Sequence, residues 1–317
     1  MSDKLILICT DVSEPSTDVV CSWLHHYNKK FVRISFENII TIKSVSITNS
    51  TIDIQFAIDD IDYNLSDFQS YWYRRSCLSF AAFAPIKYIH DGIDLSSKMN
   101  NFLYEEYAKL KEFFKYELNK IAILNKYEDN EINKLKVLSI AKDCGIAISD
   151  TYVVENMHSL DFANSRYITK AISDLVIVHD NQNYYCTTER IDEPDNDISF
   201  SLVQKEVKKI FEIRSFFFNR QFFSSAIFSQ ENEKTKLDFR NYDFENPNRV
   251  VPFQLPEQME EKLLALADKI ELKCGSFDLA YTNEDEFVLF EVNPVGQFEQ
   301  VTFPCNYSIH KLIAQAL

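Results

Sequence analysis

Residues 277–294 read Phe-Asp-Leu-Ala-Tyr-Thr-Asn-Glu-Asp-Glu-Phe-Val-Leu-Phe-Glu-Val-Asn-Pro, and this stretch carries the strongest structural signal in the chain. Two nearly apolar runs, 276–281 and 286–292, flank a polar four-residue segment, which predicts a β-hairpin. Because side chains alternate along a strand, Glu291 and Asn293 share one face. Asp278, on the partner strand, is expected to come close to both.

These three oxygen-bearing side chains form a pattern typical of a hard-cation site. Magnesium in proteins is commonly held by one or two carboxylates together with substrate phosphates. A solvated strand face is the alternative interpretation. However, the neighbours of Asp278, Glu291 and Asn293 are apolar, and a buried carboxylate without compensation costs several kcal/mol. The sequence therefore favours a magnesium site on this hairpin.

The glycine content and the charge of the chain exclude several kinds of protein. Only four of the 317 residues are glycine, at positions 92, 145, 275 and 296, so neither a G-x-G-x-x-G turn nor a P-loop can be written. With 33 basic and 48 acidic residues the net charge is −15, which disfavours nucleic-acid binding through phosphates. A nucleotide would have to be held by other means.

The seven cysteines are scattered and form no C-x-x-C motif, which indicates free thiols in a reducing compartment. The apolar run at 5–9 is too short for a signal peptide or a membrane span. We therefore expect a cytoplasmic protein that does not insert into membranes.

Hydrophobic periodicity predicts the main elements. A strand at 5–9, a helix at 16–27 and short strands up to residue 73 form an α/β domain over 1–95. A long helix begins near residue 96, and its apolar stripe predicts core packing along its whole length. The stripe consists of Met99, Phe102, Leu103, Tyr107, Leu110, Phe114, Leu118 and Ile121.

Further elements follow in the second half. A helix over 133–144 ends at Gly145, which supplies a left-handed cap. A hairpin over 175–188, strand pairs between 199 and 228, a loop over 232–252 and a helix over 256–272 precede the final hairpin. The class indicated is α/β, with α and β elements mixed.

Charged residues within apolar strands are candidates for binding an anion. Lys170 is either a phosphate ligand or a lysine at a strand end, and Lys134 is a weaker candidate of the same kind. Glu212 and Arg214 share a strand face, where they either pair with each other or leave Arg214 to meet an anionic substrate. For Arg74 and Arg75 beside Trp72 the structural interpretation is indole stacking or a salt bridge, and a functional role stays open.

In this order, the motifs resemble the ATP-grasp superfamily of carboxylate-amine ligases, and within it the peptide macrocyclases of microviridin and related graspetide biosynthesis, of the chryseoviridin type. Residues 71–75, Tyr-Trp-Tyr-Arg-Arg, are similar to a W-x-R-R signature. Asn133-Lys134 with residues 145–151 resembles an N-K…G-x-x-x-P-x-T passage, and Asp278…Glu291-x-Asn293-Pro-x-Gly296-Gln297 is the most specific match.

The resemblance implies an ATP-grasp fold, with the nucleotide between two antiparallel sheets. It implies an N-terminal domain at 1–95, linker helices with a central subdomain at 96–190, and a C-terminal subdomain with the metal site at 191–317. It also implies a role for each candidate residue: Lys134 and Lys170 at the ATP phosphates; Gln204, Lys205, Glu206 and Val207 as the adenine hinge; Glu212 at the ribose; Asp278, Glu291 and Asn293 as Mg²⁺ ligands; and Arg214 and Arg240 as the catalytic arginines at the substrate carboxylate and acyl phosphate.

Two positions depart from the family pattern. Ser149 replaces the proline of the G-x-x-x-P-x-T passage, which loosens a turn but removes no ligand. The segment after Lys170 lacks the glycine-rich lid that covers the phosphates in many ATP-grasp enzymes.

The activity implied is formation of side-chain ester or amide rings in a ribosomal precursor peptide, with ATP and Mg²⁺ and through an acyl phosphate. The partner implied is a leader peptide followed by a core rich in Thr, Ser, Asp and Glu, with the leader on the 176–190 hairpin, and the family implies a homodimer. The alternatives are an ATP-grasp ligase that adds an amino acid to a carboxylate, and a non-catalytic nucleotide-binding regulatory protein. Because the chain is acidic, an acidic substrate requires a local basic patch near Arg214 and Arg240.

Overall fold

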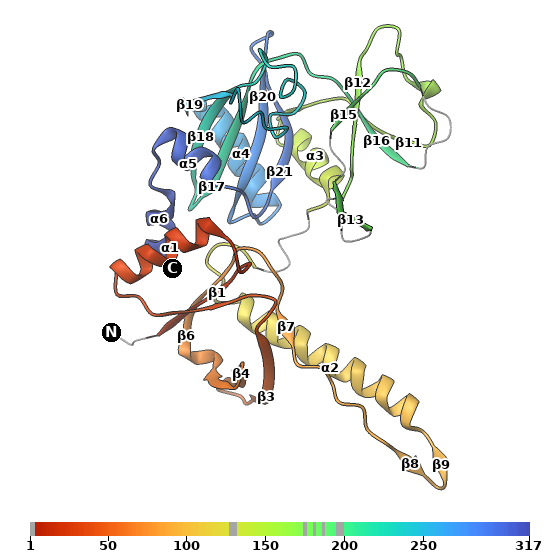
Figure 1. Ribbon diagram of the computed structural model, residues 1–317, viewed down its shortest axis with the longest axis vertical. Coiled ribbons are helices and arrows are strands. Elements are labelled where there is room, and N and C mark those ends of the chain that lie inside the picture. Colours follow the sequence, from red (N-terminus) through yellow and green to blue (C-terminus); the bar gives the residue numbers. More distant parts are fainter. Residues whose placement is uncertain (1–3, 127–131, 174–175, 180–181, 186–187, 195–199) are drawn as a thin grey trace. The chain divides into compact units, whose positions relative to one another are not determined.

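The computed structural model describes residues 4–126, 132–173, 176–179, 182–185, 188–194 and 200–317 (Figure 1). The chain forms two compact units. Met1–Asn130 together with Ile309–Leu317 make the first, and Glu131–Ser308 make the second. The division into three segments at residues 95 and 190 is a different partition of the chain and stays a prediction.

The first unit contains a small parallel sheet in the order β2-β1-β6. Its strands are β1 (Leu5–Cys9), β2 (Phe31–Ile34) and β6 (Phe68–Tyr73), and α1 (Pro15–His26) connects the first two. Pro15 stands in the first turn of α1, where no N–H is needed, and the Glu14 side chain caps the backbone N–H groups of Ser16 and Thr17. The strand–helix start predicted from the sequence is confirmed.

A second sheet in this unit has the order β5-β4-β3-β7, with the short helix η1 (Leu65–Asp67) after β5. The strands are β3 (Ile39–Ile47), β4 (Ile52–Ile58), β5 (Ile61–Asn64) and β7 (Ser79–Phe80). Phe56 of β4 is fully buried and stacks edge-on against Phe114, which places one face of this sheet in the core of the unit.

Helix α2 (Ser96–Asn119) follows the small hairpin of β8 (Ile89–His90) and β9 (Ile93–Asp94), which lies at its N-terminal end (Figure 1). The prediction of core packing along the whole helix is right for Phe114 and Leu118, which are buried, and wrong for Phe102, which is 57% exposed. The first turns of α2 are held instead by Asn100, whose side chain bonds to the backbone of Ile86.

Helix α6 (Ile309–Ala316) belongs to the first unit although it ends the sequence, and the sequence interpretation did not include it. It packs on α1, and Lys29 donates to the carbonyl oxygens of Ala314 (3.0 Å) and Gln315 (2.9 Å). The hydroxyl of Ser70 in β6 donates to the backbone oxygen of Leu317 at 3.0 Å. The first unit is therefore completed by both ends of the described chain.

Arg74 lies at the end of β6 inside this unit and is 2% exposed. Its Nη2 is 3.1 Å from Glu14 Oε1, and its Nε donates to Ser16 Oγ at 3.2 Å. Of the two alternatives drawn from the sequence, the salt bridge is the one found. Arg74 thus ties the end of β6 to the start of α1.

The second unit is built on a six-stranded sheet in the order β10-β21-β20-β17-β18-β19. All neighbouring strands are antiparallel except β10 and β21. The strands are β10 (Ala147–Ile148), β17 (Lys209–Phe218), β18 (Gln221–Phe228), β19 (Arg249–Phe253), β20 (Cys274–Thr282) and β21 (Phe287–Asn293). Strand β19 corrects the prediction of a loop over 232–252, because Val250 and Val251 pair with Ile227 and Ala226 of β18.

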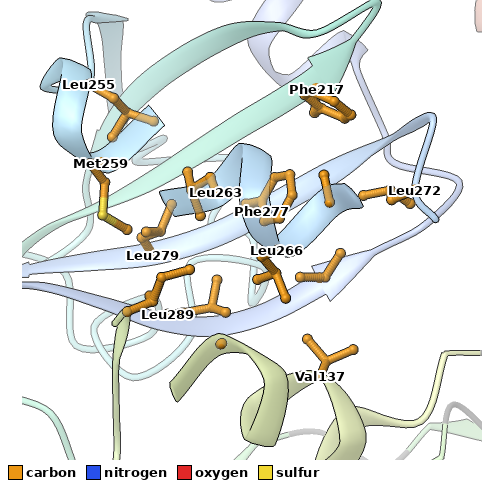
Figure 2. Packing of buried hydrophobic residues seen from close by; sticks show 14 of the residues in the cluster. Val137, Phe217, Leu255, Met259, Leu263, Leu266, Leu272, Phe277, Leu279 and Leu289 are labelled. Carbon is orange, nitrogen blue, oxygen red and sulfur yellow. The ribbon is translucent and has the colours of Figure 1, made fainter. Parts of the chain in front are cut away.

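Helices cover this sheet on both faces. Phe277, Leu279 and Leu289 pack against Leu263 and other residues of α4 (Glu257–Lys269), with Val137 of α3 (Lys134–Asp143) in the same cluster (Figure 2). On the opposite face Phe216 contacts Phe298, at the start of α5 (Glu299–Cys305).

A smaller antiparallel sheet in the order β11-β16-β12-β15 completes the second unit, with the short helix η3 (Met157–Ser159) after β11. The strands are β11 (Thr151–Val154), β12 (Tyr167–Lys170), β15 (Glu189–Ile191) and β16 (Ser201–Lys205), and β13 (Val176–His179) pairs with β14 (Gln182–Tyr185) as the predicted hairpin. Residues 180–181, at the tip of that hairpin, lie outside the described residues. In the part of the chain that the structure describes, no helix is both long and apolar enough to cross a membrane.

Candidate active site

Alternation along the strands of the six-stranded sheet separates its apolar residues from its charged ones. Phe277 and Leu279 point to α4, so Asp278 between them faces the other side (Figure 2). The register places Arg214 of β17 and Glu291 of β21 directly opposite Asp278. Three charged side chains therefore form a row across three neighbouring strands, as the hairpin pattern predicted for two of them.

The row is closely bonded. Arg214 Nη1 lies 3.0 Å from both carboxylate oxygens of Asp278. The Asn293 amide nitrogen donates to Asp278 Oδ2 at 3.0 Å and to Glu291 Oε1 at 3.3 Å. Arg214, Asp278 and Glu291 are all buried. Asn293 thus bridges the two carboxylates, and the predicted proximity of Asp278, Glu291 and Asn293 is found.

The pKa values of the two buried carboxylates shift in opposite directions. Burial raises the pKa of Asp278 to about 7, although the Arg214 charge opposes the shift. Burial also acts to raise the pKa of Glu291, but the positive charges of Arg240, Lys170 and Lys134 outweigh it and leave this pKa below the usual value. The two groups differ because Glu291 faces three cations and Asp278 is wholly enclosed.

Arg240 enters the site from the loop between β18 and β19. Its Nη1 is 2.6 Å from Glu291 Oε1, and its Nη2 is 2.7 Å from Asp238 Oδ2. Its Nε also donates to Asp238 Oδ1 at 2.9 Å, and Thr188 Oγ1 donates to Asp238 Oδ2 at 3.2 Å. Asp238 therefore binds the Arg240 guanidinium in a bidentate ion pair.

Two lysines also act electrostatically on Glu291. Lys170 Nζ, at the end of β12, donates to the Phe290 carbonyl at 3.1 Å, and Lys134 Nζ donates to the Ala171 carbonyl at 3.3 Å. Burial lowers the pKa of Lys170, partly offset by Glu291, and the charges of Lys134 and Arg240 lower it further. Lys134, Lys170 and Arg240 are thus close enough to act on one anion.

The predicted adenine hinge is the end of β16 and the residues after it. Gln204 is buried and donates to Thr151 Oγ1 at 2.8 Å, and Lys205 forms a 2.8 Å ion pair with Asp150. Glu206 is held by two hydrogen bonds from Arg190, at 2.9 and 2.6 Å. These contacts fix the segment that connects the two sheets of the unit.

Ser149, which stands where the resembled sequence pattern has a proline, makes a specific hydrogen bond. Its hydroxyl donates to the Lys205 carbonyl at 2.6 Å. The turn that loses a proline is thereby fastened to the hinge segment by a hydrogen bond.

Glu212 pairs with Lys209 and not with Arg214, so the mutual ion pair weighed from the sequence is wrong. Lys209 Nζ lies 2.9 Å from Glu212 Oε1, and Ser229 Oγ donates to the same oxygen at 2.9 Å. Burial raises the pKa of Glu212, while Lys209 opposes the shift. Arg214 therefore forms its ion pair with Asp278.

A cavity of about 430 Å³ lies between the two sheets of the second unit. Nine of the twelve predicted site residues line it: Lys170, Gln204, Lys205, Glu206, Val207, Glu212, Arg240, Asp278 and Glu291. The other three, Lys134, Arg214 and Asn293, lie next to lining residues. The volume falls within the range of small-molecule sites, which is roughly 300–1,000 Å³.

The lining is basic compared with the acidic chain. It includes eight basic residues, among them Arg166, Lys208 and Lys236, and six acidic ones. The local basic patch expected from the sequence is therefore present, and this cavity suits an anionic ligand.

The carboxylate pair fits a divalent cation that keeps some of its waters. Asp278 and Glu291 are both buried, face the cavity and are held together by Asn293. Within the described ranges no group of three or more His, Cys, Asp or Glu side chains is placed to hold a metal. Two carboxylates that face a basic cavity match the way Mg²⁺ is bound by one or two carboxylates together with substrate phosphates.

Several lining residues were missed from the sequence, notably Lys209 and Asp238. Asp238 stands two residues before Arg240, so its carboxylate could have been expected on the same loop. Lys209 follows Lys208 at the start of an apolar strand, which is an ordinary place for a solvated lysine. Only the fold shows that it is buried against Glu212.

The fold is shared with several solved ligases. The chain is similar to the macrocyclase MdnC bound with the precursor peptide MdnA from Microcystis aeruginosa MRC, with 20% identity over 99% of both chains and a TM-score of 0.72. It is also similar to a Chryseobacterium gregarium RiPP-associated ATP-grasp ligase in complex with ADP and a leader and core peptide. Here the identity is 19%, the coverage 99% of this chain and 95% of that one, and the TM-score 0.71.

A third similar structure is the ATP-grasp ligase PsnB complexed with a phosphomimetic variant of a minimal precursor, Mg and ADP. The identity is 14%, all of this chain and 98% of that chain are covered, and the TM-score is 0.69. No family model and no curated protein matches the sequence. The full-length matches establish the fold, and the expected ATP-grasp architecture is confirmed.

Proposed function

We propose, starting from a fold shared with ATP-grasp ligases, that this protein uses ATP to close side-chain ester or amide rings in a ribosomal precursor peptide. The observation that supports it most directly is the charged row Arg214–Asp278–Glu291 beside a basic cavity between two sheets. Such a cavity suits a nucleoside triphosphate, and the buried Arg214 together with the partly exposed Arg240 suits a second, carboxylate-bearing substrate.

In this proposal ATP lies between the sheets. The segment Gln204 to Val207 faces the adenine, and Glu212 faces the ribose. Lys170 and Lys134 stand at the phosphates as point charges. Asp278, Glu291 and Asn293 would hold Mg²⁺, which would supply neutralisation of phosphate charge.

Arg214 and Arg240 then position the substrate. A carboxylate oxygen of the peptide attacks the terminal phosphorus, the bond to ADP breaks, and an acyl phosphate forms. The arginines are already held by Asp278 and by Asp238 with Glu291, so little reorganisation is needed when charge develops. Phosphoryl transfer depends mainly on such positioning and charge stabilisation.

The proposed partner is a precursor peptide with a leader and a core rich in Thr, Ser, Asp and Glu. Among the described strands, β13 and β14 pair only with each other, so their outer edges are available for pairing. This hairpin is the proposed surface for the leader, by strand addition or helix docking. A homodimer and a cytoplasmic location complete the proposal. Light scattering on the purified protein measures the first of these directly.

Incubation with ATP, Mg²⁺ and a set of candidate precursor peptides tests the activity. We expect the mass of the peptide to fall by one water for each ring, with one ADP formed per ring. A gain in mass would instead indicate the addition of an amino acid. Unmodified peptide across all candidates would reject the proposed function.

A further inference from the structure

The loop between β18 and β19 presents aromatic side chains immediately beyond Arg240. Tyr242 is 45% exposed and Phe244 is 89% exposed, and their rings lie 6.1 Å apart at an angle of 33°. Large apolar side chains gathered at the edge of a polar site commonly mark a binding surface. Neither residue lines the cavity assigned to the nucleotide.

Two glutamines from the segment after β21 join these rings. Gln300 donates through Nε2 to the Tyr242 hydroxyl and to Gln297 Oε1, the latter at 3.0 Å. The Gln300 Oε1 atom is buried, and no partner for it exists among the described residues. The two hydrogen bonds donated by Gln300 Nε2 therefore fix the position of Gln300 Oε1, which accepts no hydrogen bond from the described residues.

A tight turn places this second segment. Gly296 has φ of +49°, and a Cβ there would lie 2.7 Å from Ser276 Oγ and 2.9 Å from the Gly275 carbonyl carbon. The turn after Asn293 can therefore approach β20 only with glycine at this position. Gln297, the next residue, therefore lies close to β20, the strand that contains Asp278.

The surface also adjoins the catalytic arginines. Burial raises the pKa of Tyr242, and the charges of Arg214 and Arg240 act on it in the opposite direction. The hydroxyl therefore lies within electrostatic reach of both guanidinium groups while remaining neutral. Tyr242 is suited to hydrogen bonding and packing there and is not a general base at neutral pH.

We infer that Tyr242, Phe244, Gln297 and Gln300 form the subsite for the nucleophile-bearing segment of the peptide, on the side of the arginines away from the nucleotide cavity. This inference rests on the proposed function. The four side chains, which we name the Tyr242 surface, carry no charge. Aromatic faces and amides match an extended peptide with hydroxyl or amine side chains better than they match a phosphate.

The chemistry at this subsite is the ring-closing step. The oxygen of a Thr or Ser side chain, or the nitrogen of a Lys side chain, forms a bond to the acyl carbon. The bond between that carbon and the phosphate oxygen breaks, phosphate leaves with the electron pair, and the proton of the nucleophile passes to solvent. The Tyr242 surface positions the nucleophile, and Arg214 and Arg240 hold the acyl phosphate.

The test compares Tyr242→Ala, Tyr242→Phe and Phe244→Ala with Phe200→Ala, which removes an exposed phenylalanine elsewhere in the same unit. The substrate is a synthetic precursor with a threonine- and glutamate-rich core. We expect Tyr242→Ala and Phe244→Ala to raise the peptide KM about tenfold through lost aromatic contact, with the ATP KM unchanged. Rings formed per ADP should also fall, because water then competes for the acyl phosphate. Tyr242→Phe should restore most of the coupling, and Phe200→Ala should behave as wild type.

Two outcomes are kept apart by the design. Absence of ADP and rings with the wild-type protein rejects the proposed function and, with it, the inference that rests on it. With an active wild type, peptide-dependent protection of residues 241–246 in hydrogen exchange supports the inference, and no protection overturns it. An active wild type whose peptide KM and coupling do not change in Tyr242→Ala and Phe244→Ala overturns the inference alone. Melting temperatures equal to wild type exclude misfolding of the variants.

Discussion

Arg240 and Glu291, 51 positions apart in the chain, meet with Nη1 of the arginine 2.6 Å from Oε1 of the glutamate. The arginine comes from a loop and the glutamate from strand β21 of the six-stranded sheet, so the contact depends on how the loop is held. Asp238 provides that support through hydrogen bonds to both Nε and Nη2 of Arg240.

The first prediction concerns this support. Asp238→Asn should weaken the hydrogen bonds that orient the Arg240 guanidinium, so that the guanidinium no longer has a fixed direction. The kcat for ring formation should then fall about 10- to 100-fold, as expected when a positioned group is misplaced. Steady-state kinetics measures the loss. Glu245→Gln, an exposed carboxylate on the same loop, is the control and should keep wild-type kcat. Equal activity of the two variants would show that Asp238 does not position Arg240.

The second prediction concerns Lys170. Replacement by Met should weaken ATP binding about 10- to 100-fold, which is the usual worth of a hydrogen bond to a charged group. Because the amine is buried and its pKa is lowered by that burial, an apolar side chain should not reduce the melting temperature. Calorimetric titration with ADP and ATP gives the affinities. Lys136→Met, at an exposed position on α3, should bind as wild type does.

The third prediction concerns the metal. Chelation with EDTA should abolish ATP consumption by the wild-type protein, and Glu291→Gln should remove the stabilisation that MgADP gives in thermal melting. The physical reason is that a neutral amide is a weaker ligand for a hard cation than a carboxylate. Glu286→Gln, on the exposed part of the same hairpin, should retain the MgADP shift. A shift of equal size in both variants would remove Glu291 from the metal site.

The fourth prediction compares two glycines that both have positive φ. Gly92→Ala meets no atom within 4 Å, so its cost is only that of the left-handed backbone, about 1–2 kcal/mol. Gly296→Ala adds overlap with Ser276 and Gly275, for which about 1–3 kcal/mol more is expected. Urea denaturation of both variants gives the difference. Equal losses would mean that the turn after β21 moves without cost.

The fifth prediction is a pH dependence in the first unit. Burial acts to raise the pKa of Glu14, but Arg74, the Ser16 hydroxyl and Arg75 lower it below its usual value. A lowered carboxylate pKa stabilises the folded state above the unfolded value, about 4.3, and this stabilisation is lost as the pH falls through the folded pKa. His310 of α6 also lies near Arg74, and burial lowers its pKa.

Glu14→Gln should therefore cost about 3–5 kcal/mol at pH 7, because Arg74 is left buried without its carboxylate partner. The gap in melting temperature between wild type and variant should narrow as the pH falls below about 4.3, where the unfolded carboxylate becomes protonated, and close as the pH falls through the lower folded pKa of Glu14. A gap that stays constant from pH 7 to pH 3.5 would contradict the ion pair as its cause.

The sequence predicted the second unit well, because its strands are apolar and its charges are few. In such strands each charged residue has to have a partner, so Asp278, Glu291 and Arg214 were recognisable from period-two alternation alone. The strand β19 was missed because Asn and Asp around residues 241–248 are typical of a loop, and the two valines that follow are too short a run to indicate a strand.

Partners far apart in the sequence could not be predicted in the same way. The pairing of Glu212 with Lys209 depends on a register shift between Lys209 and Phe211 in the β17–β20 ladder, which no local pattern reports. The exposure of Phe102 is of the same kind, because it depends on which other elements pack against the start of α2. An apolar stripe shows that a helix has one hydrophobic face, but it does not show which residues, if any, cover that face.

The return of α6 to the first unit makes the second unit, in topological terms, an insertion within the first. During synthesis on the ribosome β1 and α1 emerge before residues 131–308, and α6, the helix that packs on α1, emerges after them. Residues 131–308 can therefore fold while the first unit still lacks α6. The first unit is started before the second unit but can be completed only after the second unit has been translated.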